Sequence, residues 1–203
     1  MTRFSILIPA AGASRRMQGR DKLLEPVDGD PLLRRQVRRA LATGARVLVT
    51  LPRADHPRAD ALTGLDVAVV PAPDADEGMA ASIRAGIAAL SPGTPGVAIL
   101  PADMPDIRTD DLLALMDRFE TEGGQAVVQA AGADGTPGHP VLFPADCIPA
   151  LLQIKGDVGA RAVLRAEQDR LIRVSLAGQR ALTDLDTPTA WNAWRAAQTG
   201  KTC

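Results

Sequence analysis

Several residue types are scarce in this 203-residue sequence, and each scarcity excludes a class of protein. There is no tyrosine, and there are only two tryptophans and three phenylalanines, so the chain offers no basic stripe interleaved with aromatic side chains. Acidic and basic residues nearly cancel, which leaves a formal net charge of -1. Both observations argue against a nucleic-acid-binding surface, and we expect no nucleic-acid partner.

Cysteine and long apolar runs are also scarce. Cys147 and Cys203 lack the spacing of metal ligands, and Cys203 is the last residue, so we expect a structural thiol and a loose tail in a reduced cytosolic protein. No apolar run approaches the roughly 20 residues that a membrane span needs. The first apolar stretch is interrupted by Pro9 and Gly12, which is untypical of a signal peptide. We therefore expect no membrane association, a cytoplasmic location and a monomer.

Short aliphatic runs alternate with amphipathic segments through most of the chain. Strands are expected at 4–9, 46–52, 66–71, within 97–105 and at 125–131, and helices at 31–44, 57–63, 79–90 and 110–123. Strands that are almost entirely apolar and separated by helices indicate a mainly parallel sheet covered on both faces. The length suffices for one sizeable core. The sequence therefore predicts a single, Rossmann-like, three-layer α/β domain.

The loop AAGASRRMQGRDK, residues 10–22, follows the first predicted strand directly. In such sheets ligands bind beyond the carboxyl ends of the strands. Small residues from Ala10 to Ala13 let backbone N–H groups approach a phosphate, and Arg16 and Lys22 can supply positive charge. The chain has only three lysines, which makes Lys22 an unusual choice. A solvated basic loop is the alternative, since neither a Walker loop nor a G-x-G-x-x-G fingerprint is present.

Two aspartates are candidate metal ligands. Asp103 lies in LPADMPDI, after an apolar strand, and Asp186 lies in TDLDTP. Mg²⁺ takes one or two protein carboxylates and leaves its other positions to water and substrate phosphates. The alternative is a helix N-cap, which on its own is favoured for Asp186 because Thr187 and Pro188 follow it. Asp103, followed by Met-Pro, fits a cap less well.

Six ordered motifs resemble the molybdenum cofactor cytidylyltransferase family, part of a wider group of NTP-transferases with a glycosyltransferase-A-like, Rossmann-related fold. The motifs are AAGASRRM with a following lysine, EGMAASIRAGI at 77–87, LPADMPDI, GHPVLF at 138–143, GDVGARAVL at 156–164 and DLDTP at 184–188. They span nearly the whole chain. The resemblance implies transfer of CMP from CTP to the phosphate of molybdopterin carrying molybdenum, with release of pyrophosphate.

The resemblance also implies roles for individual residues. Arg16, Lys22 and Asp103 would be catalytic, and Asp103 and Asp186 would hold Mg²⁺. The nucleotide would contact the loop residues Ala10, Ala11, Gly12, Ala13 and Ser14 together with Arg16, Lys22, Gly78, Ser82 and Asp103. The acceptor would contact Gly138, His139, Pro140, Gly156, Asp157 and Arg161. His139 has an alternative interpretation, in which it only orders a tight loop. Residues 1–105 would mainly bind the nucleotide, residues 106–198 would mainly bind the acceptor, and residues 199–203 would form a tail.

The first loop departs from the family pattern at one position. Gln18 separates the arginine-methionine pair from Gly19, so that Lys22 comes one residue later than in relatives. Either the loop bulges or Gly19 takes the place of the usual glycine.

Alternatives to this function remain within and outside the enzymes. Members that use CTP read A-A-G at the position of residues 10–12, as this chain does, whereas members that use GTP read A-G-G. A related transferase could use GTP, or a sugar or polyol phosphate as acceptor. A non-catalytic carrier of the finished cofactor is the alternative from another class. A client molybdoenzyme or its chaperone is a further expected partner.

Overall fold

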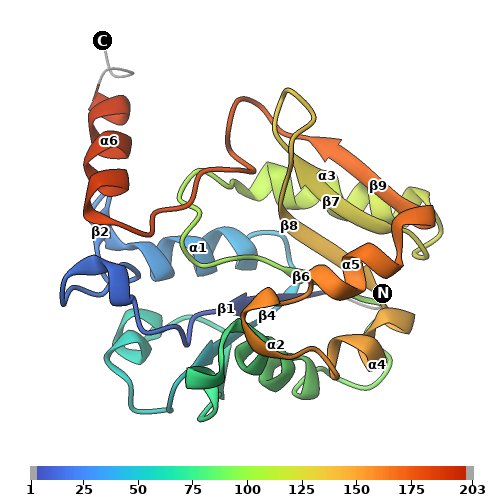
Figure 1. Ribbon diagram of the computed structural model, residues 1–203, viewed down its shortest axis with the longest axis horizontal. Coiled ribbons are helices and arrows are strands. Elements are labelled where there is room, and N and C mark those ends of the chain that lie inside the picture. Colours follow the sequence, from blue (N-terminus) through green and yellow to red (C-terminus); the bar gives the residue numbers. More distant parts are fainter. Residues whose placement is uncertain (1–3, 200–203) are drawn as a thin grey trace.

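The computed structural model describes residues 4–199, which form a sheet with helices on both faces (Figure 1). The seven strands of the sheet are β1 (Ser5–Pro9), β4 (Arg46–Leu51), β5 (Ala68–Pro71), β6 (Gly96–Ile99), β7 (Val127–Ala131), β8 (Pro137–Pro144) and β9 (Leu171–Ser175). The α-helices are α1 (Leu32–Leu41), α2 (Met79–Ala88), α3 (Thr109–Thr121), α4 (Ile148–Leu151), α5 (Arg161–Ala166) and α6 (Pro188–Thr199). A small hairpin joins β2 (Pro26–Val27) to β3 (Asp30–Pro31).

The sheet is mixed but mainly parallel, in the order β5-β4-β1-β6-β8-β7-β9. Only β8 runs antiparallel to its neighbours among the strands of this sheet, all of which lie within residues 4–199. From β1 the chain first adds β4 and β5 on one side and then β6 on the other side. The order therefore reverses between β1 and β6, and the carboxyl ends of these two strands form the crevice where sheets of this kind bind ligands.

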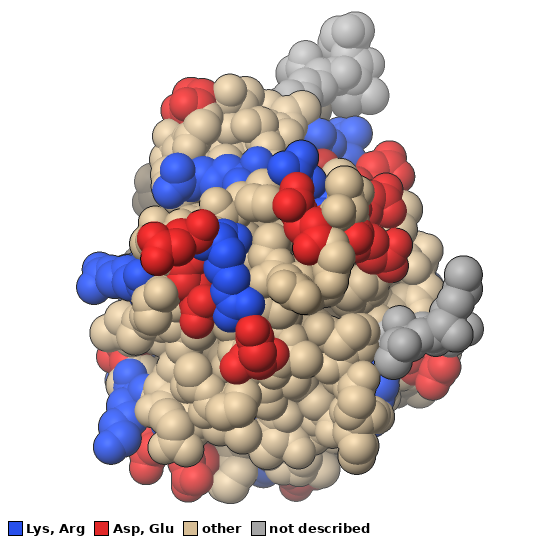
Figure 2. Space-filling model, turned by 90° about the vertical axis from the view of Figure 1, so that its right-hand side faces the viewer, with Lys and Arg blue, Asp and Glu red and all other residues tan. Residues whose placement is uncertain are grey.

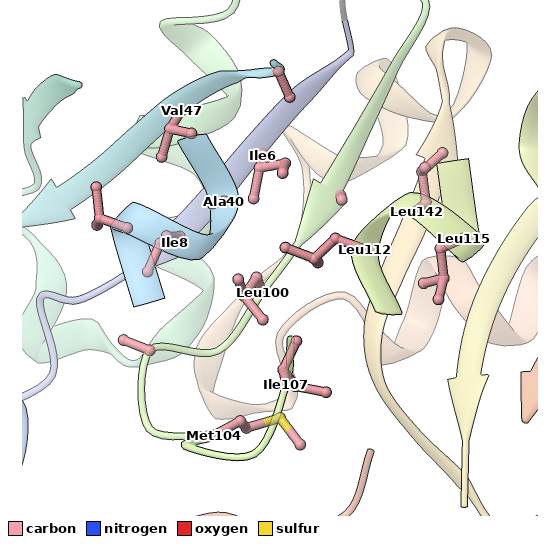
Figure 3. Close-up of a cluster of buried hydrophobic side chains, with 14 of the residues drawn as sticks. Ile6, Ile8, Ala40, Val47, Leu100, Met104, Ile107, Leu112, Leu115 and Leu142 are labelled. Carbon is pink, nitrogen blue, oxygen red and sulfur yellow. The ribbon is translucent and has the colours of Figure 1, made fainter. Parts of the chain in front are cut away.

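Successive side chains of β1 point to opposite faces of the sheet, and both faces are covered by apolar clusters. Ile6 and Ile8 join the apolar cluster beneath α1 and α3, whereas Leu7 joins the opposite cluster beneath α2, α4 and α5. Figure 3 shows the first cluster, where Ala40 of α1 and Leu112 of α3 face Ile6 and Leu100. A parallel strand that is buried on both faces therefore carries apolar residues at nearly every position.

The predicted α/β class and mainly parallel sheet are confirmed. The predicted strands and helices up to residue 131 are present, although the segment 57–63 forms a 3₁₀ helix, Pro57–Leu62. Beyond residue 131 only a carboxy-terminal helix was expected, and β8, β9, α4 and α5 were not predicted. Helices α4 and α5 are short and β9 lies at the edge of the sheet. Strand β8 lies between β6 and β7, but three prolines and a glycine among its eight residues interrupt the apolar pattern.

The arginine doublets along α1 are a pattern typical of a solvated helix face, but two of these side chains bond to neighbouring segments. Arg34 donates to the carbonyl oxygens of Ala61 and Thr63, and Arg39 donates to those of Pro105 and Ile107. Long side chains with several donors can cover a helix and still bond to neighbouring loops. Arg34 ties α1 to the end of the 3₁₀ helix after β4, and Arg39 ties it to the loop that follows β6.

Of the two cysteines, Cys147 lies among the described residues. Cys147 is a free thiol buried in the α2 and α4 layer, and burial raises its pKa to about 11, in keeping with a structural role. Cys203 and the tail at 200–203 lie outside the described residues.

In residues 4–199, no helix has the length and apolar character required to cross a bilayer.

Gly86 offers a test of the contact between α2 and β1. A Cβ at this position would lie 2.2 Å from Cδ1 of Leu7, a fully buried residue of the central strand. We expect Gly86→Ala to lower the free energy of unfolding by about 1–3 kcal/mol through overpacking. Urea denaturation measures this, with Ala88→Ser on the exposed side of the same helix as the control. An unchanged midpoint for Gly86→Ala would show that the two elements are not so closely packed.

Candidate active site

The loop between β1 and α1 is held in place by a buried arginine that the sequence did not single out. Arg58, from the 3₁₀ helix Pro57–Leu62, is 2% exposed. Its guanidinium donates to both carboxylate oxygens of Asp21, at 2.7 and 2.8 Å, to the Ala10 carbonyl and to Oγ of Ser14. Burial opposes ionisation of Asp21, but the bonds from Arg58 hold the pKa of this carboxyl below its usual value. A bidentate pair of this kind fixes both ends of the loop.

The extra residue of the loop is accommodated by two left-handed residues. Gln18 and Gly19 have φ values of 54° and 85°, and both follow the short 3₁₀ helix Arg15–Met17. Met17 is fully buried in a cluster with Leu185 and Trp191, which anchors the turn. The loop therefore turns sharply at Gln18 and Gly19 and returns Lys22 to the sheet edge.

Lys22 joins the loop to both candidate metal ligands. Its Nζ lies 2.5 Å from Oδ2 of Asp103 and also bonds to Oδ1 of Asp186. Arg16 bonds to the other oxygen of Asp186. Two predicted residues of the loop and the two predicted acids, which are up to 170 positions apart in the chain, therefore form one ionic cluster. Lys22, Asp103 and Asp186 have side-chain exposures of only 17–23%.

The charges within this cluster reinforce one another. Burial alone would lower the pKa of Lys22, but the carboxylates of Asp103 and Asp186 raise it above its ordinary value. Burial likewise favours the neutral form of Asp186, yet Lys22 and Arg16 hold the pKa of this carboxyl below its usual range. Lys22 and Asp186 are therefore both stabilised in their charged forms.

Asp184 is a third carboxylate that the sequence analysis missed. Carboxylate oxygens of Asp103, Asp184 and Asp186 lie within 4.8 Å of one another, an all-oxygen donor set that suits a hard divalent cation. The pKa of Asp184 is raised by burial and by its two acidic neighbours, in contrast to that of Asp186. The alternation D-x-D in TDLDTP was the available signal, because residues two apart in an extended segment face the same way.

The N-cap interpretation of Asp186 is wrong. Helix α6 begins at Pro188, and the hydroxyl of Thr187 accepts the N–H of Ala190 at 3.2 Å. Thr187 is thus the capping residue, and the carboxylate of Asp186 is free to bind Lys22 and Arg16. The proline located the start of the helix correctly, but the capping residue is one position later than the residue that the sequence favoured.

Buried hydrogen bonds position the two acidic segments. The Leu185 N–H donates to the carbonyl of Asp103 at 3.0 Å, which places Asp184 and Asp186 beside it. Nε1 of Trp191, a fully buried side chain of α6, donates to the carbonyl of Leu185. Gln36 of α1 donates to the carbonyl of Met104 at 2.6 Å. Trp191 therefore both packs in the core and orients the acids.

A cavity of about 300 Å³ lies between the loop and α2. Several of the predicted nucleotide-binding residues line it, namely Gly12, Ala13, Lys22, Gly78, Ser82 and Asp103, together with Asp157. Gly78 has a φ of 115°, and a Cβ there would lie 2.3 Å from Oδ1 of Asp157 and 2.8 Å from the backbone of Gly156. Ser82 is buried and shares a hydrogen bond of 2.5 Å with Thr50. Asp157, predicted on the acceptor side, thus faces this cavity.

The other residues of the loop are divided between the core and a second cavity. Ala11 and Ser14 line a space of about 410 Å³ beside Arg58, on the other side of the loop. Ala10 is 1% exposed and belongs to the core. Gly12 and Ala13 line both spaces, so the loop forms the wall between them.

A third cavity, of about 710 Å³, opens on the β8 side of Asp103. Gly138, His139 and Arg161 line it, together with all three aspartates. Pro140 is buried in β8 and Gly156 is exposed, and among the described residues neither lines this cavity. Nδ1 of His139 is buried without a hydrogen-bond partner, and burial lowers the pKa of this imidazole. The backbone N–H of His139 donates to Ala181 at 2.9 Å, so the residue also orders its loop.

The comparisons with known proteins agree on a family. A family model described as a MobA-like NTP transferase domain matches residues 6–171. The purine catabolism protein PucB of Bacillus subtilis (strain 168) is 31% identical over 201 residues, which cover 93% of this chain and 94% of that protein. A molybdenum cofactor guanylyltransferase of Cupriavidus metallidurans is 30% identical over 185 residues, 89% of each chain.

A solved structure has a similar fold. The crystal structure of Rv0371c from Mycobacterium tuberculosis H37Rv has a TM-score of 0.77 and 27% identity, and the match covers 95% of this chain and 98% of that one. Curated relatives whose names state a nucleotide are guanylyltransferases, so the comparisons support the wider family and not the expected use of CTP.

Lys22 provides a test of the carboxylate cluster as a cation site. Its ammonium group occupies oxygens that a divalent cation would need, so we expect Lys22→Met to bind Mn²⁺ about tenfold more tightly than the unsubstituted protein in the absence of nucleotide. Mn²⁺ electron paramagnetic resonance measures the free ion directly. Lys155→Met, at an exposed position, is the matched control. Equal or weaker Mn²⁺ binding by Lys22→Met would contradict the shared site.

Proposed function

The chain belongs to the MobA-like NTP transferase family and is a nucleotidyltransferase, and we propose that it transfers CMP from CTP to the phosphate of a molybdopterin-type cofactor. Pyrophosphate is the other product. Relatives named as molybdenum cofactor guanylyltransferases support the acceptor. The motifs GHPVLF and GDVGAR support the same choice over a sugar or polyol phosphate, because in this chain both contribute residues to the cavities around Asp103.

One observation carries this proposal: the two cavities meet at Asp103. The smaller one, between the loop and α2, and the larger one, beside β8, share Asp103, Pro101 and Met79 as lining residues. A transferase that joins two phosphates needs both substrates to reach one point at the same time. The smaller cavity holds the donor in this proposal, and the larger one holds the acceptor.

The residues at the junction supply charge and position. Lys22 and Arg16 are the cations beside Asp103 and Asp186, and we assign them to the phosphates of the donor. Two phosphate charges brought within about 4 Å repel by about 4 kcal/mol at an effective dielectric constant near 20, so fixed cations at this point lower the barrier. Asp103 and Asp186, with Asp184, would hold Mg²⁺, which when bound would neutralise phosphate charge.

The chemical step requires no general base in this proposal. An oxygen of the acceptor phosphate is already anionic, and it forms a bond to the α-phosphorus of CTP while the bond from that phosphorus to the bridging oxygen breaks. Pyrophosphate leaves with the electron pair. The backbone of Gly12 and Ala13 approaches the donor closely enough to hold its phosphates during this exchange.

GTP is the second candidate donor, because the relatives' names include guanylyltransferases. Two features support CTP. The sequence A-A-G at residues 10–12 matches the members that use CTP, although Ala11 lines the cavity on the Arg58 side rather than the smaller donor cavity. The donor cavity itself is only about 300 Å³ and is walled at Gly78 by Gly156 and Asp157. A pyrimidine fits such a space more readily than a purine.

Pyrophosphate release tests both the reaction and the donor. With molybdenum-loaded molybdopterin and Mg²⁺, we expect release with CTP and at least tenfold slower release with GTP, ATP and UTP. Faster release with GTP would retain the transferase and reject CTP. A non-catalytic carrier would release none with any nucleotide, and the family membership argues against that alternative.

Asp103→Asn tests the junction itself. Removing this charge should lower kcat by about 10²–10³, the magnitude seen when one transition-state contact is lost. Asp110→Asn, at an exposed position in the first turn of α3, is the control and should retain full activity. Circular dichroism verifies that both variants fold. Full activity of a folded Asp103→Asn would remove this residue from the site.

A further inference from the structure

Two buried hydroxyl groups meet on the α2 side of the donor cavity. Charged side chains lie mostly at the surface, and Figure 2 shows one face of the molecule on which basic and acidic groups adjoin. Thr50 of β4 and Ser82 of α2 are instead buried polar residues, 0% and 3% exposed, and their hydroxyl oxygens lie 2.5 Å apart. Ser82 lines the donor cavity, whereas Thr50 lies behind it. Only one member of this buried pair can therefore contact a bound nucleotide.

The surroundings of Thr50 leave its hydroxyl a single partner. Its side chain lies on the same face of the sheet as Leu48, two positions earlier, which packs beneath α2. Its neighbours in register are Pro9 of β1 and Val70 of β5, whose side chains offer no acceptor. Within the part of the chain that the structure describes, the Thr50 and Ser82 hydroxyls bond to no group other than each other.

The backbone of Thr50 connects this pair to the opposite wall of the cavity. Its carbonyl accepts the N–H of Ala10 at 3.0 Å, at the start of the loop whose residues Gly12 and Ala13 line the same cavity. The hydroxyl of Thr50 holds α2, and its carbonyl holds the loop. The Ser82 oxygen is therefore kept at a fixed place relative to the loop on the other side.

A hydrogen bond between two hydroxyls can run in either direction, and burial decides the direction here. If Ser82 donated to Thr50, the Thr50 proton would be buried without an acceptor, an arrangement that folded proteins avoid. If Thr50 donates, Ser82 can direct its own proton into the cavity that it lines. The bond therefore runs from Thr50 to Ser82, and Ser82 presents a hydrogen-bond donor to the occupant of the cavity.

We propose that Thr50 is a positioning residue for the donor nucleotide, because it directs the Ser82 proton toward an acceptor atom of the base. This inference rests on the proposed function, which places the nucleotide in this cavity. Cytosine accepts hydrogen bonds at its carbonyl oxygen and ring nitrogen, whereas its amino group only donates. A fixed proton on Ser82 therefore orients the base, with its accepting edge toward α2 and its amino group away from Ser82.

Thr50→Val and Ser82→Ala, alone and combined, test this positioning. Isothermal titration with a non-hydrolysable CTP analogue and Mg²⁺ measures Kd for each protein. Loss of one hydrogen bond should raise Kd about fivefold in Ser82→Ala. A hydroxyl proton that is free to occupy three staggered positions should raise Kd about threefold in Thr50→Val. Thr50→Ser, which keeps the hydroxyl, should restore the Kd of the unsubstituted protein.

The combined variant distinguishes positioning from a merely structural role. Because Thr50 acts through Ser82, adding Thr50→Val to Ser82→Ala should raise Kd no further. If Thr50 only packs in the sheet, Thr50→Val would raise Kd by the same factor in both backgrounds or in neither, and either result overturns the inference. Thr94→Val is the matched control: it removes another buried hydroxyl, bonded to the carbonyl of Ser91 and outside the donor cavity, and should leave Kd unchanged.

The stability of the same variants tests the direction of the bond. Ser82→Ala leaves the Thr50 hydroxyl buried without its acceptor, whereas the combined variant removes both hydroxyls and leaves no orphaned group. The urea midpoint should therefore be lower for Ser82→Ala than for the combined variant. The reverse order would mean that Thr50 has another acceptor, and it would overturn the assigned direction.

A second nucleotide separates failure of this inference from failure of the proposed function. If the unsubstituted protein binds a GTP analogue and not the CTP analogue, the proposed use of CTP is wrong. The same variants are then titrated with the GTP analogue, since guanine also offers acceptor atoms. An effect of Thr50→Val that depends on Ser82 would support the inference with either nucleotide, and its absence would overturn the inference alone. Binding of neither analogue would overturn both.

Discussion

The ion pairs of Lys22 with Asp103 and Asp186 are the interaction on which the site depends. They join the loop after β1, the loop after β6 and the segment before α6, three parts of the chain that are brought together only by the fold. Each of these charges is partly buried; the two carboxylates stabilise the ionised form of Lys22, and Lys22 stabilises that of Asp186. The charges of the site therefore already neutralise one another before substrates bind. In the proposed function, a phosphate replaces the carboxylates as the partner of Lys22, and a divalent cation replaces Lys22 as the partner of the carboxylates. The resting protein holds the proposed catalytic residues together by the same interaction that the proposed reaction must rearrange.

The layered sheet explains why the cluster forms where it does. The strand order reverses between β1 and β6, so the loops that follow these two strands meet at one edge of the sheet. Arg58 fixes the first loop from the side of β4, and Gln36 fixes the second from α1. Trp191 of α6 fixes the third segment through Leu185. The three segments of the site are thus positioned by buried hydrogen bonds from three different elements, and these bonds do not use the site's own charged groups.

The sequence predicted the part of this arrangement that follows from local pattern. Apolar strands and small-residue loops located β1, β6 and the residues Arg16, Lys22 and Asp103, because a strand end with charge is visible locally. Asp186 was found only as one of two alternatives, since a cap and a ligand have the same local sequence. Arg58 and Asp184 were missed, because their roles depend on contacts with distant residues. The division of the chain at residue 105 stays a prediction, and Asp157, which lies after it, lines the smaller cavity, while Asp103 lines both.

The exchange of Lys22 between carboxylates and phosphates is the central claim, and a crystal structure with Mn²⁺ and a non-hydrolysable CTP analogue tests it most directly. Anomalous scattering would locate the ion. The account predicts Mn²⁺ on the oxygens of Asp103 and Asp186, with Nζ of Lys22 moved from these carboxylates to a phosphate oxygen. An ion bound elsewhere, with Lys22 still held between Asp103 and Asp186, would contradict it.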